Sequence, residues 1–223
     1  MKKVKVLIVD DHPIIAQSFV LALNKVENDF KKYKFEITET NTLDEAYNLV
    51  ANVKNLVFDL VFLDIKMPPS KDMKLLSGED LGIMIRKEKL KTKIIISTTY
   101  NDNYRINVLL KSINPDGFLI KNDLTPDFLV FAINEVLSGS PAYSKTIKLY
   151  LKKMIDSDFQ IDQIDRSILF NLSIGRRMNE LPNHVPLSLA GIERRKRQLK
   201  IKFNIEGRDD TTLIEIAKQL GFI

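Results

Sequence analysis

The stretch Lys5-Val6-Leu7-Ile8-Val9 runs directly into Asp10-Asp11. A short apolar run bounded by polar residues indicates a buried strand. A second apolar run, residues 60–63, ends in the same way on Asp64. Open α/β sheets bind their ligands outside the carboxyl ends of parallel strands. We therefore expect Asp10, Asp11 and Asp64 to lie close together at one edge of a parallel sheet.

Two further apolar runs also end on residues with hydroxyl or ammonium groups. Residues 94–96 lead into Ser97-Thr98-Thr99, and residues 117–120 end on Lys121. Three carboxylates, a hydroxyl and an ammonium at one edge describe a site that accepts a phosphoryl group with Mg²⁺, which prefers hard oxygen ligands. Asp64 is the expected nucleophile, because a carboxylate can form an aspartyl-phosphate. A single aspartate after a strand is usually a turn residue, so the prediction depends on the conjunction.

The sequence pattern predicts two domains joined by a linker. Strand and helix patterns alternate over residues 1–140, which is typical of a doubly wound parallel α/β sheet. Strands are expected near residues 4–9, 35–39, 58–63, 93–97 and 117–120, and helices over 14–27, 43–53, 79–88, 102–112 and 125–137. A linker, 141–160, is expected to contain a helix over 143–155. The remainder, 161–223, shows no strand pattern, and helices are expected over 163–173, 177–181, 188–202 and 210–219.

Composition narrows the class of protein. The 223 residues include no cysteine, which excludes a disulfide framework and a cysteine metal site. No apolar run approaches the roughly 18 residues of a membrane span, and the N-terminal segment does not resemble a signal peptide. We therefore expect a cytoplasmic protein. Residues 1–140 carry 19 basic and 19 acidic side chains, whereas residues 161–223 carry 11 and 8, so the positive charge is concentrated in the second domain.

The first domain resembles the receiver domain of two-component response regulators over residues 3–138. The resemblance is carried by Asp10-Asp11, Asp64-Ile65-Lys66-Met67-Pro68, Thr98 and Lys121. It implies a five-stranded, CheY-like (flavodoxin-like) sheet and a sensor histidine kinase that phosphorylates Asp64. It also implies that Mg²⁺ is surrounded by Asp10, Asp11, Asp64 and the backbone carbonyl of Lys66.

The resemblance further implies a switch. Thr98 and Lys121 would contact the phosphoryl oxygens, and Phe118 would turn inward as the Thr98 hydroxyl moves toward the phosphoryl group. Phe118 is also compatible with an ordinary core position. His12, which follows the aspartate pair, is expected to be a residue of the loop or helix start rather than a catalytic group.

One loop departs from the receiver pattern. Residues 69–77 separate Pro68 from Gly78, so the loop after the acceptor strand is about six residues longer than is usual in the family. Such a loop could tune access to the site. It could equally be a tolerated surface insertion, because added loop length costs little free energy.

Residues 188–202 predict a basic helix with a serine N-cap. The run Arg194–Lys202 holds six basic residues and no acidic one. A helix of this kind after a short helix and a turn is the outline of a helix-turn-helix DNA reader. A solvated basic helix is the plain alternative. The DNA contacts are expected from Ser188, Arg194, Arg195, Lys196, Arg197, Lys200 and Lys202.

The register of the second domain resembles LuxR-type (NarL-like) helix-turn-helix domains. The matching residues are Gly175, Glu180, Leu181, Val185, Leu187, Ser188, Ile192, Leu199, Lys202 and Phe203. The resemblance implies double-stranded DNA as a partner and a homodimer on phosphorylation. Pro182 falls within the first helix of the reader, which predicts a shortened helix there. Glu193 and Arg195 stand where Lys and His are usual.

These patterns predict a phosphorylation-controlled, DNA-binding transcriptional regulator. The alternative is a response regulator whose basic helix binds an acidic protein partner, and the salt dependence of binding to mixed DNA would distinguish the two. A phosphatase is disfavoured, because Lys66 stands where such an enzyme needs a second acid. At most, slow self-dephosphorylation is expected.

Overall fold

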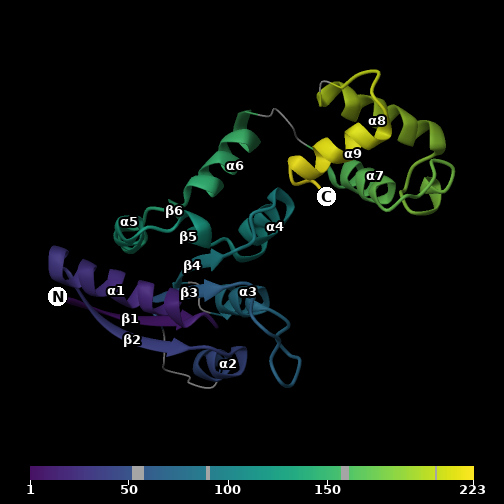
Figure 1. Ribbon diagram of the computed structural model, residues 1–223. Coiled ribbons are helices and arrows are strands. Elements are labelled where there is room, and N and C mark those ends of the chain that lie inside the picture. Colours follow the sequence, from purple (N-terminus) through teal and green to yellow (C-terminus); the bar gives the residue numbers. More distant parts are fainter. Residues whose placement is uncertain (52–57, 89–90, 157–160, 204) are drawn as a thin grey trace. The chain divides into compact units, whose positions relative to one another are not determined.

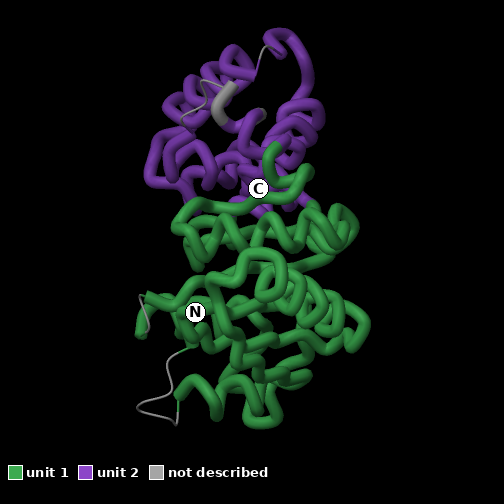
Figure 2. The backbone as a smooth tube through the Cα atoms, turned by 90° about the vertical axis from the view of Figure 1, so that its left-hand side faces the viewer, with its two compact units in different colours: residues 1–101, 108–148 green, residues 102–107, 149–223 purple. Residues whose placement is uncertain are grey.

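The structure is a computed structural model that describes residues 1–51, 58–88, 91–156, 161–203 and 205–223. The chain divides into two compact units (Figure 2), one of residues 1–101 and 108–148 and the other of residues 102–107 and 149–223. Each unit has its own hydrophobic core. No helix in the described ranges is long and apolar enough to cross a membrane.

A parallel sheet forms the centre of the first unit (Figure 1), and its strand order in the described part of the chain is β2-β1-β3-β4-β5-β6. The strands are β1 (Lys2–Val9), β2 (Tyr33–Thr40), β3 (Leu60–Asp64), β4 (Lys93–Thr98), β5 (Gly117–Ile120) and β6 (Ala142–Tyr143). The order changes direction between β1 and β3, and ligands bind at such a switch point. The predicted doubly wound parallel sheet is confirmed.

The sequence predicts five strands, and the described residues contain a sixth. Strand β6 has two residues, Ala142 and Tyr143, which pair in parallel with Gly117 and Phe118 of β5. Two residues cannot show an alternating pattern, so periodicity could not reveal this strand. Helix α6 (Lys145–Asp156) accordingly begins after β6, and not at residue 143 as the pattern predicts.

Helices cover both faces of the sheet. Helices α1 (Pro13–Phe30) and α5 (Pro126–Ser138) lie side by side on one face, and α2 (Leu43–Ala51) and α3 (Gly78–Glu88) pack together on the other (Figure 1). Helix α4 is Asn103–Ile113. The last two residues of the predicted helix 43–53 lie outside the described residues.

Local sequence determines where α5 starts and stops. Thr125 is its N-cap, and the side chain accepts a hydrogen bond from the backbone N–H of Phe128. Pro126 occupies the first turn, where its missing N–H costs nothing. Gly139 ends the helix with φ of 98°, a left-handed conformation that glycine adopts without strain. The chain is thereby directed into β6.

The buried strands explain how the site residues are positioned. All five residues of β3 are buried, including Asp64 at its end. The ring of Phe62 stacks on Phe19 of α1 with centroids 4.4 Å apart. Because strand and helix are locked by such contacts, the carboxyl end of β3 has a fixed position in the unit.

The second unit contains α7 (Gln163–Ser173), η2 (Leu181–Asn183), α8 (Leu189–Lys202) and α9 (Asp210–Gln219). Its core is formed mainly by Ile168, Leu169, Leu181, Val185, Ile192, Leu199, Leu213, Ala217 and Phe222. The helix predicted over 177–181 is wrong in type and position: a turn leads into a 3₁₀ helix at Leu181–Asn183. Pro182 fixes its own φ and lacks an N–H, so a longer α-helix through it is disfavoured.

Gly78, the first residue of α3, lies against the backbone at the end of β3. A Cβ atom there would lie 1.9 Å from the Asp64 carbonyl oxygen, whereas at Gly82 it would meet the side-chain atoms Ile113 Cδ1 and Leu63 Cδ2 at 2.7 and 3.0 Å. Backbone cannot yield as side-chain tips can. We expect Gly78→Ala to lower the free energy of unfolding by about 3 kcal/mol and Gly82→Ala to lower it clearly less. Equal losses in urea unfolding would contradict the packing described.

Candidate functional site

Asp10 and Asp64 come together at the carboxyl end of the sheet. Asp10 follows β1, Asp64 ends β3, and the two strands pair in the register that sets Val9 beside Leu63. Both aspartates are buried, with 3% and 1% of their surface exposed. Two carboxylates at such burial repel each other and need a cation between them.

Lys121 supplies a cation to both carboxylates. It follows β5, and its Nζ lies 3.0 Å from Asp10 Oδ1 and 2.6 Å from Asp64 Oδ2. Only 6% of the lysine side chain is exposed. The structure therefore brings Asp10, Asp64 and Lys121 into one buried ionic cluster, as the ends of three strands predict.

The ionic cluster contains more carboxylates than cations. Burial raises the pKa of the Asp10 carboxyl above its ordinary value, and the nearby Asp64 charge adds to this rise; the hydrogen bonds from Lys121 and from the His12 backbone oppose it. Two buried oxygens, Asp10 Oδ2 and Asp11 Oδ1, accept no aligned hydrogen bond within the described residues. Lys121 Nζ lies 2.9 Å from Asp10 Oδ2, and His12 Nδ1 lies 2.6 Å from Asp11 Oδ1, but neither contact has the angles of a hydrogen bond. A further cation at this place would stabilise the charged carboxylates.

The donor set fits a hard divalent cation. Among the described residues, ligand atoms of Asp10, Asp11, His12 and Asp64 all lie within 4.8 Å of one another. Most of these donors are carboxylate oxygens, which Mg²⁺ and similar ions prefer. The backbone N–H of Lys66 donates to Asp64 Oδ1 over 2.9 Å, so the chain turns around the Asp64 carboxylate immediately after β3.

His12 belongs to this site more closely than the sequence indicates. It is the N-cap residue of α1, and its backbone N–H donates to Asp10 Oδ1 over 2.9 Å. Its Nδ1 atom also lies 3.9 Å from Asp64 Oδ2, while 58% of the side chain is exposed. The signal for this placement is Pro13, which favours a helix start directly after His12 and thereby holds the imidazole beside the aspartates.

Thr98 and Phe118 lie at the same end of the sheet. Thr98 pairs in register with Ile120, and its fully buried hydroxyl oxygen accepts a hydrogen bond from the Tyr100 backbone N–H over 3.2 Å. Within the described ranges, no hydrogen bond joins Thr98 to Asp64. Phe118 is fully buried beside Ile96 of β4. The structure thus places this pair at the same end of the sheet as Asp64, and no hydrogen bond within the described residues joins it to the ionic cluster.

The extended loop, residues 69–77, is folded upon itself. Ser70 is 3% exposed, and its Oγ donates to Asp72 Oδ1 over 2.9 Å and accepts from the Leu75 N–H over 3.0 Å. Hydrogen bonds from Lys74 and Ser70 lower the pKa of Asp72 to about 2. The Lys71 N–H donates to both carboxylate oxygens of Asp44 at the start of α2, at 3.1 and 3.2 Å. The insertion is therefore an ordered element bound to α2.

The 3₁₀ helix η1 (Lys121–Asp123) connects the ionic cluster to the start of α6. Asp123 accepts hydrogen bonds from Ser144 Oγ at 2.7 Å, from the Thr146 N–H at 2.8 Å and from Thr146 Oγ1 at 3.1 Å. Ser144 Oγ in turn accepts from the Ile120 N–H over 3.1 Å. Sequence reasoning missed these residues, because serine and aspartate at turns carry no specific signal.

In the second unit, Arg195 of α8 is turned toward α7. Its Nη1 lies 2.6 Å from Asp162 Oδ2 and 3.2 Å from Asp165 Oδ1. Asp165 is 3% exposed, so Arg195 compensates a buried charge. The hydrogen bond from the Asp165 backbone, together with Arg195, lowers the pKa of Asp162. Arg195 is thus a structural member of the unit as well as a candidate DNA contact.

Lys196 and Lys200 are held in the same way by α9. Lys196 Nζ lies 2.8 Å from Asp210 Oδ2, and Lys200 Nζ lies 2.7 Å from Asp210 Oδ1. Asp210 begins α9, so both lysines help to fix α9 against α8. Arg195, Lys196 and Lys200 therefore balance charges inside the unit, which the linear pattern of charges could not indicate.

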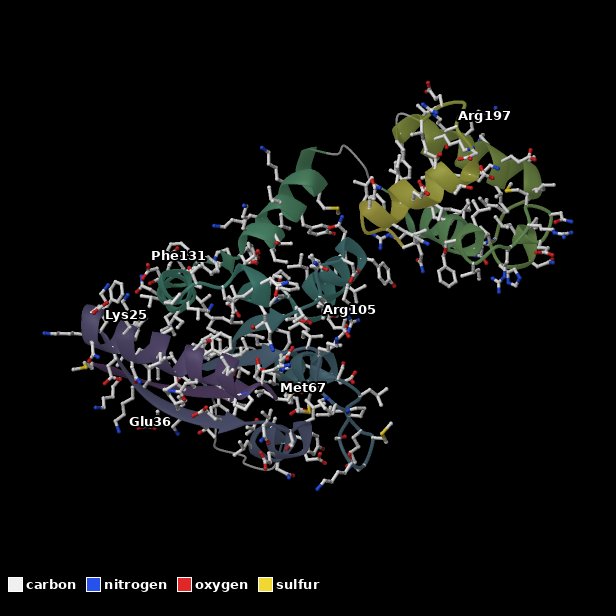
Figure 3. The ribbon with its side chains drawn as sticks, viewed as in Figure 1. Lys25, Glu36, Met67, Arg105, Phe131 and Arg197 are labelled. Carbon is white, nitrogen blue, oxygen red and sulfur yellow. The ribbon has the colours of Figure 1, made fainter. Side chains whose placement is uncertain are left out.

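The remaining candidate residues of α8 are exposed. Ser188 is the N-cap, and its Oγ accepts from the Gly191 N–H over 3.3 Å. Arg194 and Arg197 are exposed and form no ion pair within the described part of the chain, and Figure 3 shows Arg197 on the outer side of α8. Lys202 is exposed at the last turn.

The raised pKa of Asp10 has a consequence for stability. A carboxyl whose folded pKa lies above its ordinary value of 3.8 contributes stability at low pH, and that contribution is lost as pH rises through the folded pKa. We therefore expect urea unfolding near pH 7 in EDTA to show that Asp10→Asn has a free energy of unfolding about 1 kcal/mol higher than the wild type. Near pH 4 this difference should disappear.

Asp116 provides the matched control with the opposite sign. Burial would raise its pKa, but hydrogen bonds from Lys93, the Ile94 N–H and Arg86 lower it overall. Its ionised form contributes stability above the ordinary pKa and loses it as pH falls. Asp116→Asn should therefore be less stable than the wild type at pH 7. A less stable Asp10→Asn protein at pH 7 in EDTA would contradict the electrostatics described for the cluster.

Comparisons with known proteins agree with this geometry. The response regulator receiver domain family matches residues 6–133. The chain is 24% identical over 215 residues to a nitrate/nitrite response regulator protein homolog of Haemophilus influenzae, covering 95% of this chain and 96% of the relative. It is also 24% identical over 231 residues to the oxygen regulatory protein NreC of Staphylococcus epidermidis, covering 97% and 98%.

A solved structure is similar in fold over most of the chain's length. RcsB of Salmonella enterica serovar Typhimurium, bound to a promoter in the presence of the phosphomimetic BeF3-, matches with a TM-score of 0.58 and 19% identity, covering 97% of this chain and 98% of that one. The family match spans more than half of the 223 residues. The chain therefore belongs to the response regulator receiver domain family, and its second unit shares the fold of the corresponding part of RcsB.

Proposed function

We propose that this chain is a transcriptional regulator of a two-component system that accepts a phosphoryl group on Asp64 from a sensor histidine kinase. The observation that carries the proposal is the buried carboxylate of Asp64, held 2.6 Å from Lys121 beside Asp10. An Asp64 oxygen would attack the phosphorus atom as the bond to the donor imidazole breaks. The Lys121 ammonium would then pair with the phosphoryl oxygens.

Mg²⁺ is the proposed cofactor. Asp10, Asp11, Asp64 and the Lys66 carbonyl would hold it, and when bound it supplies neutralisation of the charge on the phosphoryl oxygens. The two buried oxygens without aligned hydrogen bonds, on Asp10 and Asp11, support this assignment. We expect no enzymatic activity beyond slow hydrolysis of the aspartyl-phosphate.

The proposed switch is the rearrangement of groups that the phosphoryl group would attract. Thr98 now accepts a hydrogen bond from Tyr100, and a phosphoryl oxygen would draw its hydroxyl away as a donor. Phe118, which is buried, would adjust with it. Phosphorylation would thereby shift an existing equilibrium toward a homodimer that binds DNA.

Double-stranded DNA is the proposed target of the second unit. The RcsB structure was solved with bound promoter DNA, which favours DNA over a protein partner for this fold. Ser188, Arg194, Arg197 and Lys202 are exposed on α8 and would approach the DNA directly. Arg195, Lys196 and Lys200 pair with aspartates of the same unit. They would therefore attract the DNA phosphates more weakly than the exposed arginines. We retain residues 1–140, 141–160 and 161–223 as the proposed receiver, linker and output domain.

The phosphoacceptor assignment is tested by Asp64→Asn. We expect this variant to take up no label from a radioactive small acyl-phosphate in the presence of Mg²⁺, because the amide is not a nucleophile of comparable strength. Asp59→Asn is the matched control: Asp59 lies just before the other end of β3, where its carboxylate accepts from the Lys5 N–H over 2.8 Å. Labelling of Asp64→Asn at the wild-type level would remove Asp64 from its role.

The DNA-binding face is tested by two arginines of one helix. Arg197→Ala should weaken binding to mixed duplex DNA with unchanged thermal stability, because it removes an exposed positive charge that forms no ion pair in the described part of the chain. Arg195→Ala should instead destabilise the second unit by about 2 kcal/mol, because buried Asp165 loses its partner. If the two variants bound and melted alike, the division of α8 into an exposed and a structural face would be wrong.

A further inference from the structure

The outer face of α8 has a composition that the basic run conceals. Ile192 and Leu199 are buried, and Arg195, Lys196 and Lys200 pair with aspartates of the same unit. An α-helix has 3.6 residues per turn, so the face opposite these residues is formed by the other side chains of α8. The exposed residues of the first three turns are Leu189, Ala190, Glu193, Arg194, Arg197 and Gln198. An acid thus lies among the exposed arginines.

Glu193 has no structural task in the described residues. Asp162, Asp165 and Asp210 hold the flanks of α8, whereas Glu193 forms no ion pair or hydrogen bond there. Arg197 is four residues further along the helix, a spacing that allows an ion pair, yet the two side chains are not paired. Both are therefore available to a molecule that approaches this face.

A carboxylate is costly on a surface that binds DNA, because phosphates repel it. It is tolerated where it meets a hydrogen-bond donor in the major groove, into which the first turns of a recognition helix point. Cytosine presents its amino group there as a donor, and a carboxylate accepts from it. Adenine presents an amino group beside the N7 acceptor, which would repel the second carboxylate oxygen. Arginine is suited to the acceptors of guanine.

We propose that Glu193 is a specificity-determining residue that accepts a hydrogen bond from a cytosine amino group in the major groove, beside guanine contacts made by Arg194 and Arg197. This inference rests on the proposed DNA-binding function and deepens it. It predicts half-sites in which a cytosine occupies a fixed position near guanines, and it gives the exposed acid a role in rejecting other sequences.

The test is selection from random duplex DNA by the full chain with Mg²⁺ and BeF3-, followed by sequencing of the bound pool. We expect the wild-type pool to contain one fixed cytosine in each half-site. Glu193→Gln should lower the preference for that cytosine at least tenfold and raise adenine there, because glutamine pairs with adenine. The other positions should keep their preferences. Glu206→Gln, an exposed acid beyond α8, is the matched control and should select the wild-type sequence.

The contrary outcomes separate the two levels of the proposal. The same sequence selected by the wild type and by Glu193→Gln would overturn the role of Glu193 while leaving DNA binding intact. A fixed base other than cytosine that responds to Glu193→Gln would also overturn it. Failure of every protein to enrich any sequence, even at low salt, would overturn the proposed DNA-binding function and the inference with it. Thermal melting of Glu193→Gln at the wild-type temperature excludes unfolding as the cause.

Discussion

The contact of the Lys121 ammonium with Asp10 and Asp64 is the interaction on which the receiver unit depends. Two buried carboxylates cannot both be charged at the end of a sheet without a cation, and Lys121 reaches them at 3.0 and 2.6 Å. That arrangement requires β1, β3 and β5 to end at one edge, which the parallel sheet provides. The cluster also responds to a new negative charge on Asp64, because that charge competes with Asp10 for the Lys121 ammonium.

The same lysine connects the site to the chain that follows. Lys121 begins η1, and Asp123 at the other end of η1 binds Ser144 and Thr146 at the start of α6. Strand β6 attaches this segment to β5 a second time. A movement of Lys121 toward a phosphoryl group would therefore act on the hydrogen bonds that hold the first turn of α6. We propose these hydrogen bonds as the route by which a charge on Asp64 would bias a distant equilibrium.

The sequence predicts the features that depend on patterns along the chain. Asp10, Asp64 and Lys121 follow apolar strands, and parallel strands bring such residues to one edge. It does not predict those that depend on partners far along the chain. Arg195 belongs to a basic run, yet Asp162 and Asp165 hold it. Strand β6 has only two residues, so no pattern along the chain could reveal it.

The most direct measurement is a crystal structure of the chain grown with Mg²⁺ and BeF3-. We expect beryllium density on an Asp64 oxygen, the metal held by Asp10, Asp11, Asp64 and the Lys66 carbonyl, and Lys121 Nζ moved from Asp10 to a fluoride. Density for the mimic on any other residue would contradict the role of Asp64, and Lys121 still bound to both Asp10 and Asp64 beside an occupied site would contradict the role of Lys121.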